Sequence, residues 1–223
     1  MGVVKLDAYV LIMRGKDSLN LIDGLSTNKV DSSCSTVFTT NAAKVIDLAD
    51  VIVMDDFVAI VGHNPYKENV LNHLSQKILN QDITIGDASA SNKVFLSTTE
   101  IPPPGGVTIS ETFRGWLLVA PNSVEITTTM SRSEFDDYRV ENMIPMQGCE
   151  ITPKNHPLAC GLGHLVHESK GCYIGQEVLA RMRSRGKQGK ELLRLPNPVE
   201  GATTVGQTHS LVIRRVNNTG GKF

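Results

Sequence analysis

A cysteine close to a lysine is the residue pair in this chain best suited to chemistry. Cys172 follows Lys170 by two positions in the octapeptide Lys-Gly-Cys-Tyr-Ile-Gly-Gln-Glu at 170–177. Apolar residues at helical spacing predict a helix over about 173–185, which places Cys172 at its N-terminal end. A nearby ammonium group and a helix N-terminus both lower the pKa of a thiol. We therefore predict a reactive thiolate held anionic by Lys170; the alternative is a small buried cysteine in a loop shaped by glycines.

Three more side chains of ligand type precede this cysteine. Cys160, His164 and His167 join Cys172 in a group whose residue types suit zinc. Their spacings match none of the usual zinc-finger patterns, and the two histidines are equally suited to a solvated face. We therefore assign no metal site.

Two charged groups indicate binding. Glu141, close to Arg139 near a predicted helix end, has the carboxylate geometry to accept two parallel hydrogen bonds from an amidine-like edge such as that of a pterin. The alternative is a surface ion pair of small energetic value. A basic run suits phosphates or a polyanionic tail, or is merely solvated. No aromatic residues interleave with this run, which disfavours nucleic acid as its ligand. The basic run consists of Arg181, Arg183, Arg185, Lys187 and Lys190.

The pattern of elements predicts an α+β fold. Apolar runs at 51–54 and 57–61 predict one hairpin, and runs at 116–119 and 124–128 predict a second. Ser131 and Glu134 form a capping-box pattern that starts a helix over about 134–142. Hairpins and helices mix without strict strand–helix–strand alternation, which favours α+β. Further short strands are expected at 83–85, 94–96, 192–195 and 210–216.

Composition restricts the class of protein. The 223 residues carry a net charge of −1, which gives no general attraction to nucleic acid or to an anionic membrane. No apolar stretch approaches the roughly 20 residues that span a bilayer. The first ten residues lack the pattern of a signal peptide, and the four cysteines include no CxxC pair. We expect a cytoplasmic protein without a membrane partner.

The octapeptide resembles the signature of the YgfZ family, folate-binding proteins related to the aminomethyltransferase (T protein, GcvT) of the glycine cleavage system. The resemblance covers about 10–195. Its other parts are Leu25-Ser26-Thr27-Asn28-Lys29-Val30, Lys44-Val45-Ile46-Asp47, Arg139-Val140-Glu141, Ile144-Pro145, Gly148, Glu150, Asn155, Pro157, Gly161-Leu162, Val166, Val178, Ala180-Arg181 and Gly186.

This resemblance implies a GcvT/YgfZ-like folate-binding body over 1–185 and a shortened C-terminal β-barrel remnant over 186–223. The implied ligand is tetrahydrofolate. Glu141 would hold the pterin, and the basic run would face the glutamate tail. Cys172 and Lys170 match the signature residues associated with a role in iron–sulfur cluster assembly or repair, so iron–sulfur proteins or cluster carriers are the implied partners. The folate-binding residues assigned on this basis are Glu141, Arg139, Tyr173, Gln176 and Arg183.

Departures from the family pattern define the alternatives. Leu48 follows Asp47, so the paired acid of the transferases is reduced to one residue. An aminomethyltransferase that uses Asp47 is the first alternative, and an RNA-binding or RNA-modifying protein is the second. Met143 replaces the family's glycine, where a bulkier side chain would reshape the pocket. About 30 residues after 195 are too few for a full barrel, so we expect one wall of the folate site to be either missing or supplied by the second chain of a homodimer.

Overall fold

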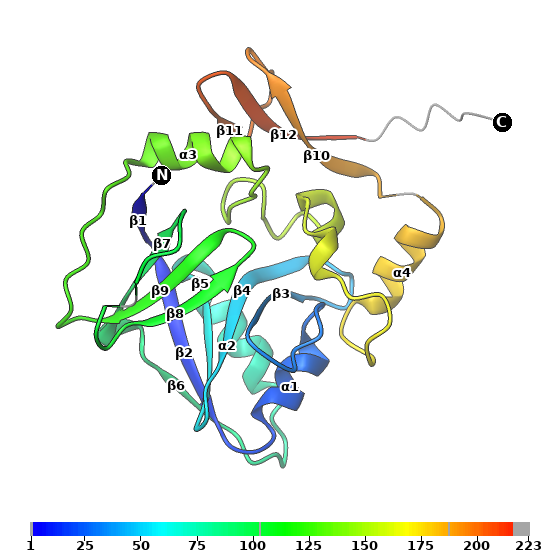
Figure 1. Cartoon of the computed structure of the whole chain (residues 1–223). Helices are drawn as coiled ribbons and strands as arrows, with labels where there is room; N and C mark the ends of the chain where they lie inside the picture. Colours follow the sequence, from blue (N-terminus) through cyan, green and yellow to red (C-terminus); the bar gives the residue numbers. More distant parts are fainter. Residues whose placement is uncertain (1, 103, 187, 216–223) are drawn as a thin grey trace.

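Two antiparallel sheets form the body of the molecule (Figure 1). The computed structural model describes residues 2–102, 104–186 and 188–215. The larger sheet has the order β3-β4-β5-β2-β6 and the smaller one the order β1-β7-β9-β8. The strands are β1 (Val3–Leu6), β2 (Ala8–Arg14), β3 (Cys34–Thr39), β4 (Val45–Val53), β5 (Val58–His63), β6 (Thr84–Asp87), β7 (Asn92–Ser97), β8 (Thr108–Thr112) and β9 (Gly115–Pro121).

Helices and further strands complete the chain. The helices are α1 (Ser18–Leu25), α2 (Lys67–Ser75), α3 (Arg132–Glu141) and α4 (Gln176–Ser184), with 3-10 turns at Asn64–Tyr66, Ser89–Ser91, Pro157–Cys160 and Gly163–Leu165. A third sheet joins β10 (Lys190–Pro196), β12 (His209–Arg215) and β11 (Thr204–Val205) in that order. No described helix combines the length and the apolar composition that crossing a membrane requires.

The five-stranded sheet is the middle layer of the body. Successive side chains of a strand point to opposite faces, and both faces of this sheet are apolar. Tyr9 and Leu11 pack on one side with Ile22 of α1 and Leu74 of α2. The opposite face packs against the four-stranded sheet through Val10, Ile52, Val61, Val94 and Leu117. A polar side chain on β4 is therefore surrounded by core on either face.

Most of the predicted elements are confirmed. The α+β content, the β4–β5 hairpin and the Ser131–Glu134 capping box are all present. The strand predicted at 124–128 is wrong. Both edges of β9 are already paired, with β7 and with β8, so no edge remains for a hairpin partner. Val124 and Ile126 instead cover the outer face of the four-stranded sheet from a loop.

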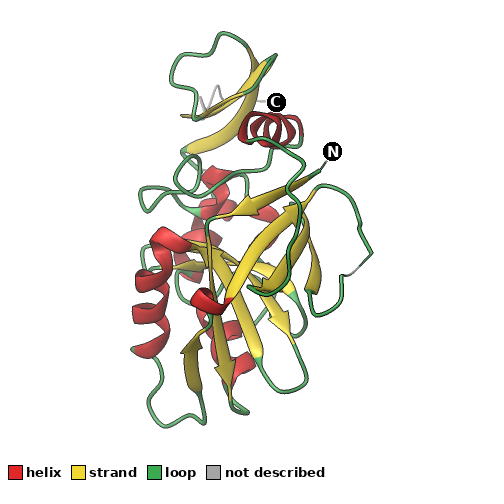
Figure 2. Ribbon diagram, turned by 90° about the vertical axis from the view of Figure 1, so that its left-hand side faces the viewer, coloured by secondary structure: helices red, strands yellow, loops and turns green. Residues whose placement is uncertain are grey.

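The C-terminal strands lie at one end of the molecule, beside α3 (Figure 2). Val140 of α3 packs against Leu192 of β10 and Leu211 of β12. The sheet is open and has three strands, and its description as a barrel remnant stays a prediction, as does the boundary at 185/186. Lys187 of the basic run and residue 216 of the predicted last strand lie outside the described residues.

Candidate functional site

Asp47 is a fully buried carboxyl group near the start of β4. The backbone N–H of His63 donates to its Oδ2 at 3.0 Å, and the Gln147 Nε2 donates to its Oδ1 at 3.2 Å. Burial raises the pKa of Asp47 to about 7, although these hydrogen bonds partly offset the shift. A carboxyl group with such a pKa exchanges a proton near neutral pH, the range in which general acids and bases work best.

Tyr9 and Gly62 complete the surroundings of this carboxyl group. Tyr9 of β2 lies directly opposite Gly62 of β5 in the antiparallel pair. A Cβ atom at Gly62 would collide with both Asp47 Oδ2 and the Tyr9 hydroxyl. That hydroxyl is buried and has no hydrogen-bond geometry toward any described atom. Burial and the neighbouring Asp47 raise the pKa of Tyr9 well above its usual value. The missing side chain at Gly62 thus lets two polar groups meet inside the core.

A small cavity lies in front of Asp47. Gly62, His63 and Gln147, each in contact with or adjacent to the Asp47 carboxylate, line it together with Arg114 and Arg139. Its volume is about 30 Å³, enough for about one water molecule. Asp47 is not among the lining residues, so access to its carboxylate requires the lining to move.

A second acid on β4, Asp50, was not singled out from the sequence. Its carboxylate forms an ion pair with the Arg114 Nη2 and accepts a hydrogen bond from Ser35 Oγ at 2.6 Å. Arg114 reaches it from the β8–β9 turn, so the pair links the two sheets. The Arg114 Nε is buried and has no hydrogen-bond partner among the described residues. An acid within a nearly continuous apolar strand was the available signal, because such a group is rarely buried unless it is paired.

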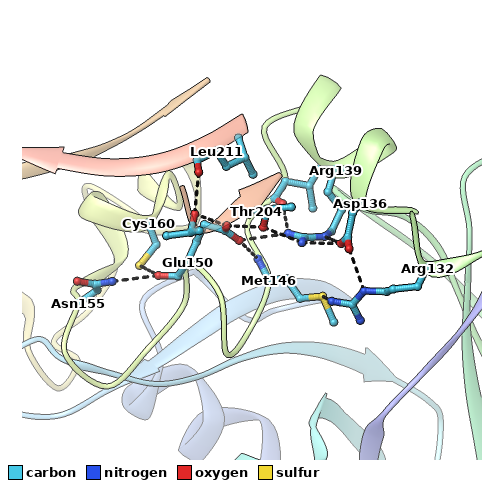
Figure 3. A network of polar contacts seen from close by, with 11 residues as sticks. Arg132, Asp136, Arg139, Met146, Glu150, Asn155, Cys160, Thr204 and Leu211 are labelled. Carbon is cyan, nitrogen blue, oxygen red and sulfur yellow. Dashed lines mark hydrogen bonds and ion pairs between the residues drawn. The ribbon is translucent and has the colours of Figure 1, made fainter. Parts of the chain in front are cut away.

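Arg139, predicted to bind folate, is engaged within the protein instead. Its guanidinium group is 1% exposed and forms ion pairs with Asp136 at 2.8 Å and Glu150 at 3.1 Å. It also donates to Thr204 Oγ1 at 2.9 Å and to the carbonyl oxygen of Ile144 at 3.2 Å. Figure 3 shows these side chains converging between α3 and the C-terminal sheet. Arg139 therefore fastens the C-terminal sheet and the 144–150 segment to α3.

Glu141 lies on a different surface from Asp47. It is exposed at the last position of α3 and lines a separate hollow of about 490 Å³ with Thr98, Thr129 and Tyr138. Residues two apart on a helix do not face each other, which explains why Arg139 is buried and Glu141 is not. The structure does not bring Glu141 to the Asp47 cavity.

Met143 follows α3 and has a positive φ of 51°. The Met143 N–H donates to the Val140 carbonyl and the Ile144 N–H to the Arg139 carbonyl, the two bonds of a Schellman motif, whose left-handed position favours glycine. The side chain is 41% exposed and does not line the cavity. The expectation that Met143 reshapes the pocket is therefore wrong, and the position has a backbone role.

Lys170 is buried against the end of α1, not presented to solvent beside the thiol. Its side chain is 1% exposed, and its Nζ contacts the Asp23 carboxylate at 2.9 Å. It also donates to the carbonyl oxygens of Asp23, Ser26 and Asn28 at 2.6 to 3.1 Å. Burial lowers the pKa of Lys170, and Asp23 partly offsets this. All four contacts join the octapeptide to the 23–28 segment, so the observed role of this lysine is structural.

The octapeptide has a second anchor at Gly175. The Thr39 Oγ1 donates to the Ile174 carbonyl oxygen at 2.6 Å. A Cβ atom at Gly175, whose φ is 87°, would approach Thr39 Oγ1 to 2.8 Å and the Thr40 carbonyl oxygen to 2.9 Å. The loop is thus held at both ends, by Lys170 and by Gly175. Cys172 lies between these anchors with an exposed side chain.

Three of the predicted site residues do lie together. Cys172, Tyr173 and Gln176 line one open hollow of about 340 Å³ before α4, and Arg183 lines an adjacent hollow with Tyr173 and Gln176. Arg183 also donates to the Gly163 carbonyl oxygen at 2.7 Å. Burial raises the pKa of Tyr173. This thiol face and the Asp47 cavity are lined by different residues, so the sequence-predicted site is divided between separate places.

The four side chains considered for zinc do not form a ligand set. Cys160 is buried and donates to the Glu150 carbonyl oxygen at 3.3 Å. The ring of His164 contacts the edge of Phe113, and His167 Nδ1 accepts from the Ser169 N–H. Among the residues that the structure describes, no group of three or more His, Cys, Asp or Glu side chains is placed to hold a metal ion.

Comparisons with known proteins identify a shared fold and a short segment of similar sequence. No family model matches the chain. An aminomethyltransferase from Symbiobacterium thermophilum is 39% identical over 56 residues, which make up 25% of this chain but only 15% of that enzyme. The crystal structure of glycine cleavage system aminomethyltransferase T from Bartonella henselae matches with a TM-score of 0.75 and 11% identity, over 96% of this chain and 78% of that one. The chain therefore has the aminomethyltransferase fold and shares a segment of similar sequence with such an enzyme.

Proposed function

We propose that this protein binds tetrahydrofolate at the Asp47 cavity and acts as a YgfZ-like accessory protein in iron–sulfur cluster assembly or repair. The observation that carries the folate part is the buried carboxyl group of Asp47, with a pKa near 7, directly behind a cavity. The aminomethyltransferase fold supports the ligand class. The accessory role rests on the resemblance of the octapeptide to the YgfZ signature.

Arg114 lines the cavity, and Asp47 and Tyr9 lie behind its lining at Gly62. A pterin ring presents both hydrogen-bond donors and acceptors. Asp47 supplies a carboxylate, while the Tyr9 hydroxyl and the Arg114 Nε are buried without hydrogen-bond partners among the described residues. Buried polar groups are rarely left unpaired without a reason. We therefore assign the pterin to the cavity that Arg114 lines in front of Asp47, in place of the surface at Glu141.

The cavity must widen before a folate can enter. Pockets for ligands of this size typically measure about 300–1,000 Å³, whereas this cavity measures about 30 Å³. The segment 144–147 forms one of its walls and is a loop, so movement there would enlarge the cavity without disturbing a sheet.

The thiol face suits a separate task. Cys172 is exposed on a loop that Lys170 and Gly175 hold in place. An accessible thiol on a fixed loop can be reached by another protein, which a buried thiol such as Cys160 cannot. We propose that Cys172 contacts the client or its cluster, while folate binds in the Asp47 cavity.

An aminomethyltransferase is the second candidate, and the pKa of Asp47 favours it. When bound, tetrahydrofolate would accept the one-carbon unit, and the Asp47 carboxyl group would hold or release a proton close to neutral pH. Leu48 stands where the transferases have the second acid of their pair. This difference does not remove the capacity for proton transfer, because the raised pKa belongs to Asp47.

The decisive experiment titrates tetrahydrofolate into the wild type, Asp47→Asn and Glu141→Ala by calorimetry. We expect at least tenfold weaker binding in Asp47→Asn and unchanged binding in Glu141→Ala. Equal affinity in the wild type and Asp47→Asn would remove the basis for the cavity assignment.

A second assay separates the two candidate functions. Recovery of an oxidatively damaged [4Fe–4S] enzyme is followed with iron, sulfide and reductant. The accessory role predicts faster recovery with the wild type than with Cys172→Ser. The transferase makes a different prediction for the formation of methylene-tetrahydrofolate from an aminomethyl donor. This activity should be retained in Cys172→Ser and lost in Asp47→Asn.

A further inference from the structure

One amide side chain closes the Asp47 carboxylate off from the cavity. Gln147 is 6% exposed, lines the cavity and lies in the loop that follows α3. Its Nε2 donates to Asp47 Oδ1 at 3.2 Å and to the Leu48 carbonyl oxygen at 2.8 Å. One –NH₂ group thus satisfies a carboxylate oxygen and a backbone oxygen of the same strand.

These two oxygens form a receptor for a single amino group. Both belong to β4, whose position is fixed by pairing with β3 and β5. The donor comes from a loop and makes no contribution to either sheet. A ligand N–H or –NH₂ group at the same place would satisfy the same two acceptors, so exchange leaves no buried oxygen unpaired.

We propose that Asp47 Oδ1 and the Leu48 carbonyl oxygen form a binding subsite for a ligand N–H group, and that the Gln147 carboxamide occupies this subsite as an internal stand-in until the ligand displaces it. The inference rests on the proposed folate function and extends it. It also explains the small cavity, because withdrawal of Gln147 both opens space and exposes Asp47.

Two sources share this ligand chemistry. The –NH₂ group of the pterin ring is one, and the amine of an aminomethyl donor is the other. In either case the protein must break two hydrogen bonds to Gln147 before the ligand can form its own. A hydrogen bond to a charged acceptor corresponds to roughly tenfold or more in affinity, so the stand-in lowers the apparent affinity of the wild type.

The test compares Gln147→Ala, Gln147→Met and the wild type for tetrahydrofolate binding by calorimetry. Alanine removes both the bulk and the two hydrogen bonds, while methionine removes the hydrogen bonds and keeps most of the bulk. We expect about tenfold tighter binding in Gln147→Ala and a smaller gain in Gln147→Met. Gln207→Ala, at an exposed position in the turn between β11 and β12, is the matched control and should bind like the wild type. Melting temperatures verify that each variant is folded.

A second readout needs no folate. Removing the Gln147 donor should raise the pKa of Asp47, since that hydrogen bond favours the charged carboxylate. Carboxyl ¹³C titration of ligand-free Gln147→Met measures this, and an unchanged pKa would contradict the proposed contact.

Binding measurements with two other ligands identify the source of the N–H group. If the pterin –NH₂ displaces Gln147, the wild type binds 2-desamino-tetrahydrofolate at least tenfold more weakly than tetrahydrofolate. If the amine of a donor does so, the two folates bind alike and methylamine binding improves in Gln147→Ala. Binding of both tetrahydrofolate and methylamine that is equal or weaker in the two Gln147 variants overturns the stand-in, whereas absence of folate binding in every variant overturns the folate proposal itself.

Discussion

Replacing Asp47 by asparagine should change how stability depends on pH. In the native state the raised pKa of Asp47 favours its protonated form below about pH 7, whereas in the unfolded chain the carboxyl group ionises near its ordinary value of 3.8. Asparagine carries one acceptor and one donor, like a protonated aspartate, and does not ionise. The variant therefore mimics the low-pH form of the site at every pH.

The size of the effect follows from the two pKa values. The stabilisation that protonated Asp47 provides is complete below about pH 4 and is lost as pH rises through about 7, because only the unfolded chain releases its proton easily. A difference of about three pKa units corresponds to about 4 kcal/mol at 1.36 kcal/mol per unit. Asp47→Asn should match the wild type within about 1 kcal/mol at pH 4 and exceed it by about 3 to 4 kcal/mol at pH 8.

Urea unfolding at pH values from 4 to 8 measures this difference. Other titrating groups cancel when the variant curve is subtracted from the wild-type curve. Asp56→Asn, which alters an exposed aspartate in the β4–β5 turn, is the control and should give a curve parallel to that of the wild type. A constant difference between Asp47→Asn and wild type over the whole range would refute the raised pKa.

Four further predictions concern two backbone positions, the buried lysine and the exposed thiol. Met143→Gly should stabilise the protein by about 1 kcal/mol, because glycine adopts the observed φ of 51° without strain; urea unfolding measures this gain. Lys170→Met should destabilise by about 3 kcal/mol, since it leaves Asp23 and buried carbonyl oxygens without their cation. Cys172→Ser should change the free energy of unfolding by less than about 0.5 kcal/mol because the thiol is exposed. Thermal melting of the wild type and of this variant measures the difference. Gly62→Ala should destabilise by about 1 to 3 kcal/mol or more through overpacking against Asp47, again by urea unfolding.

Matched controls exist for these variants. Ala43 also has a positive φ, of 58°, but its methyl group is buried, so Ala43→Gly should gain less than Met143→Gly. Gly86→Ala adds a methyl group where no atom lies within 4 Å and should be close to neutral. A gain at position 43 that equals the gain at 143, or a loss at 86 that equals the loss at 62, contradicts these explanations.

Local patterns predicted the local structure well. The two apolar runs around Asp55-Asp56 form the β4–β5 hairpin, and the Ser131–Glu134 pattern forms the capping box of α3. Each depends on residues close together in the chain. The strand predicted at 124–128 failed because its place beside β9 is taken by β8, and competition between strands for one edge cannot be seen from one segment alone.

The site depends on contacts between residues far apart in the chain. The spacing of residues within one segment does not predict such contacts. Lys170 was expected to act on Cys172, its near neighbour, but its partner Asp23 lies 147 positions away. The meeting of Tyr9, Gly62 and Asp47 requires the β2–β5 register together with the position of β4. Asp47 was predicted through the family resemblance, and its burial and raised pKa came only from the structure.

The octapeptide that first indicated chemistry has an observed structural role, and its thiol has the separate role that we propose. Lys170 and Gly175 hold the loop against α1 and the β3–β4 turn, and residues in that turn lead directly into β4 and Asp47. Substitution of either anchor should therefore disturb the cavity as well as the loop. Cys172 lies between the anchors with its thiol exposed, as the proposed contact with a client protein requires. The thiol and the buried acid thus share a scaffold but not a pocket.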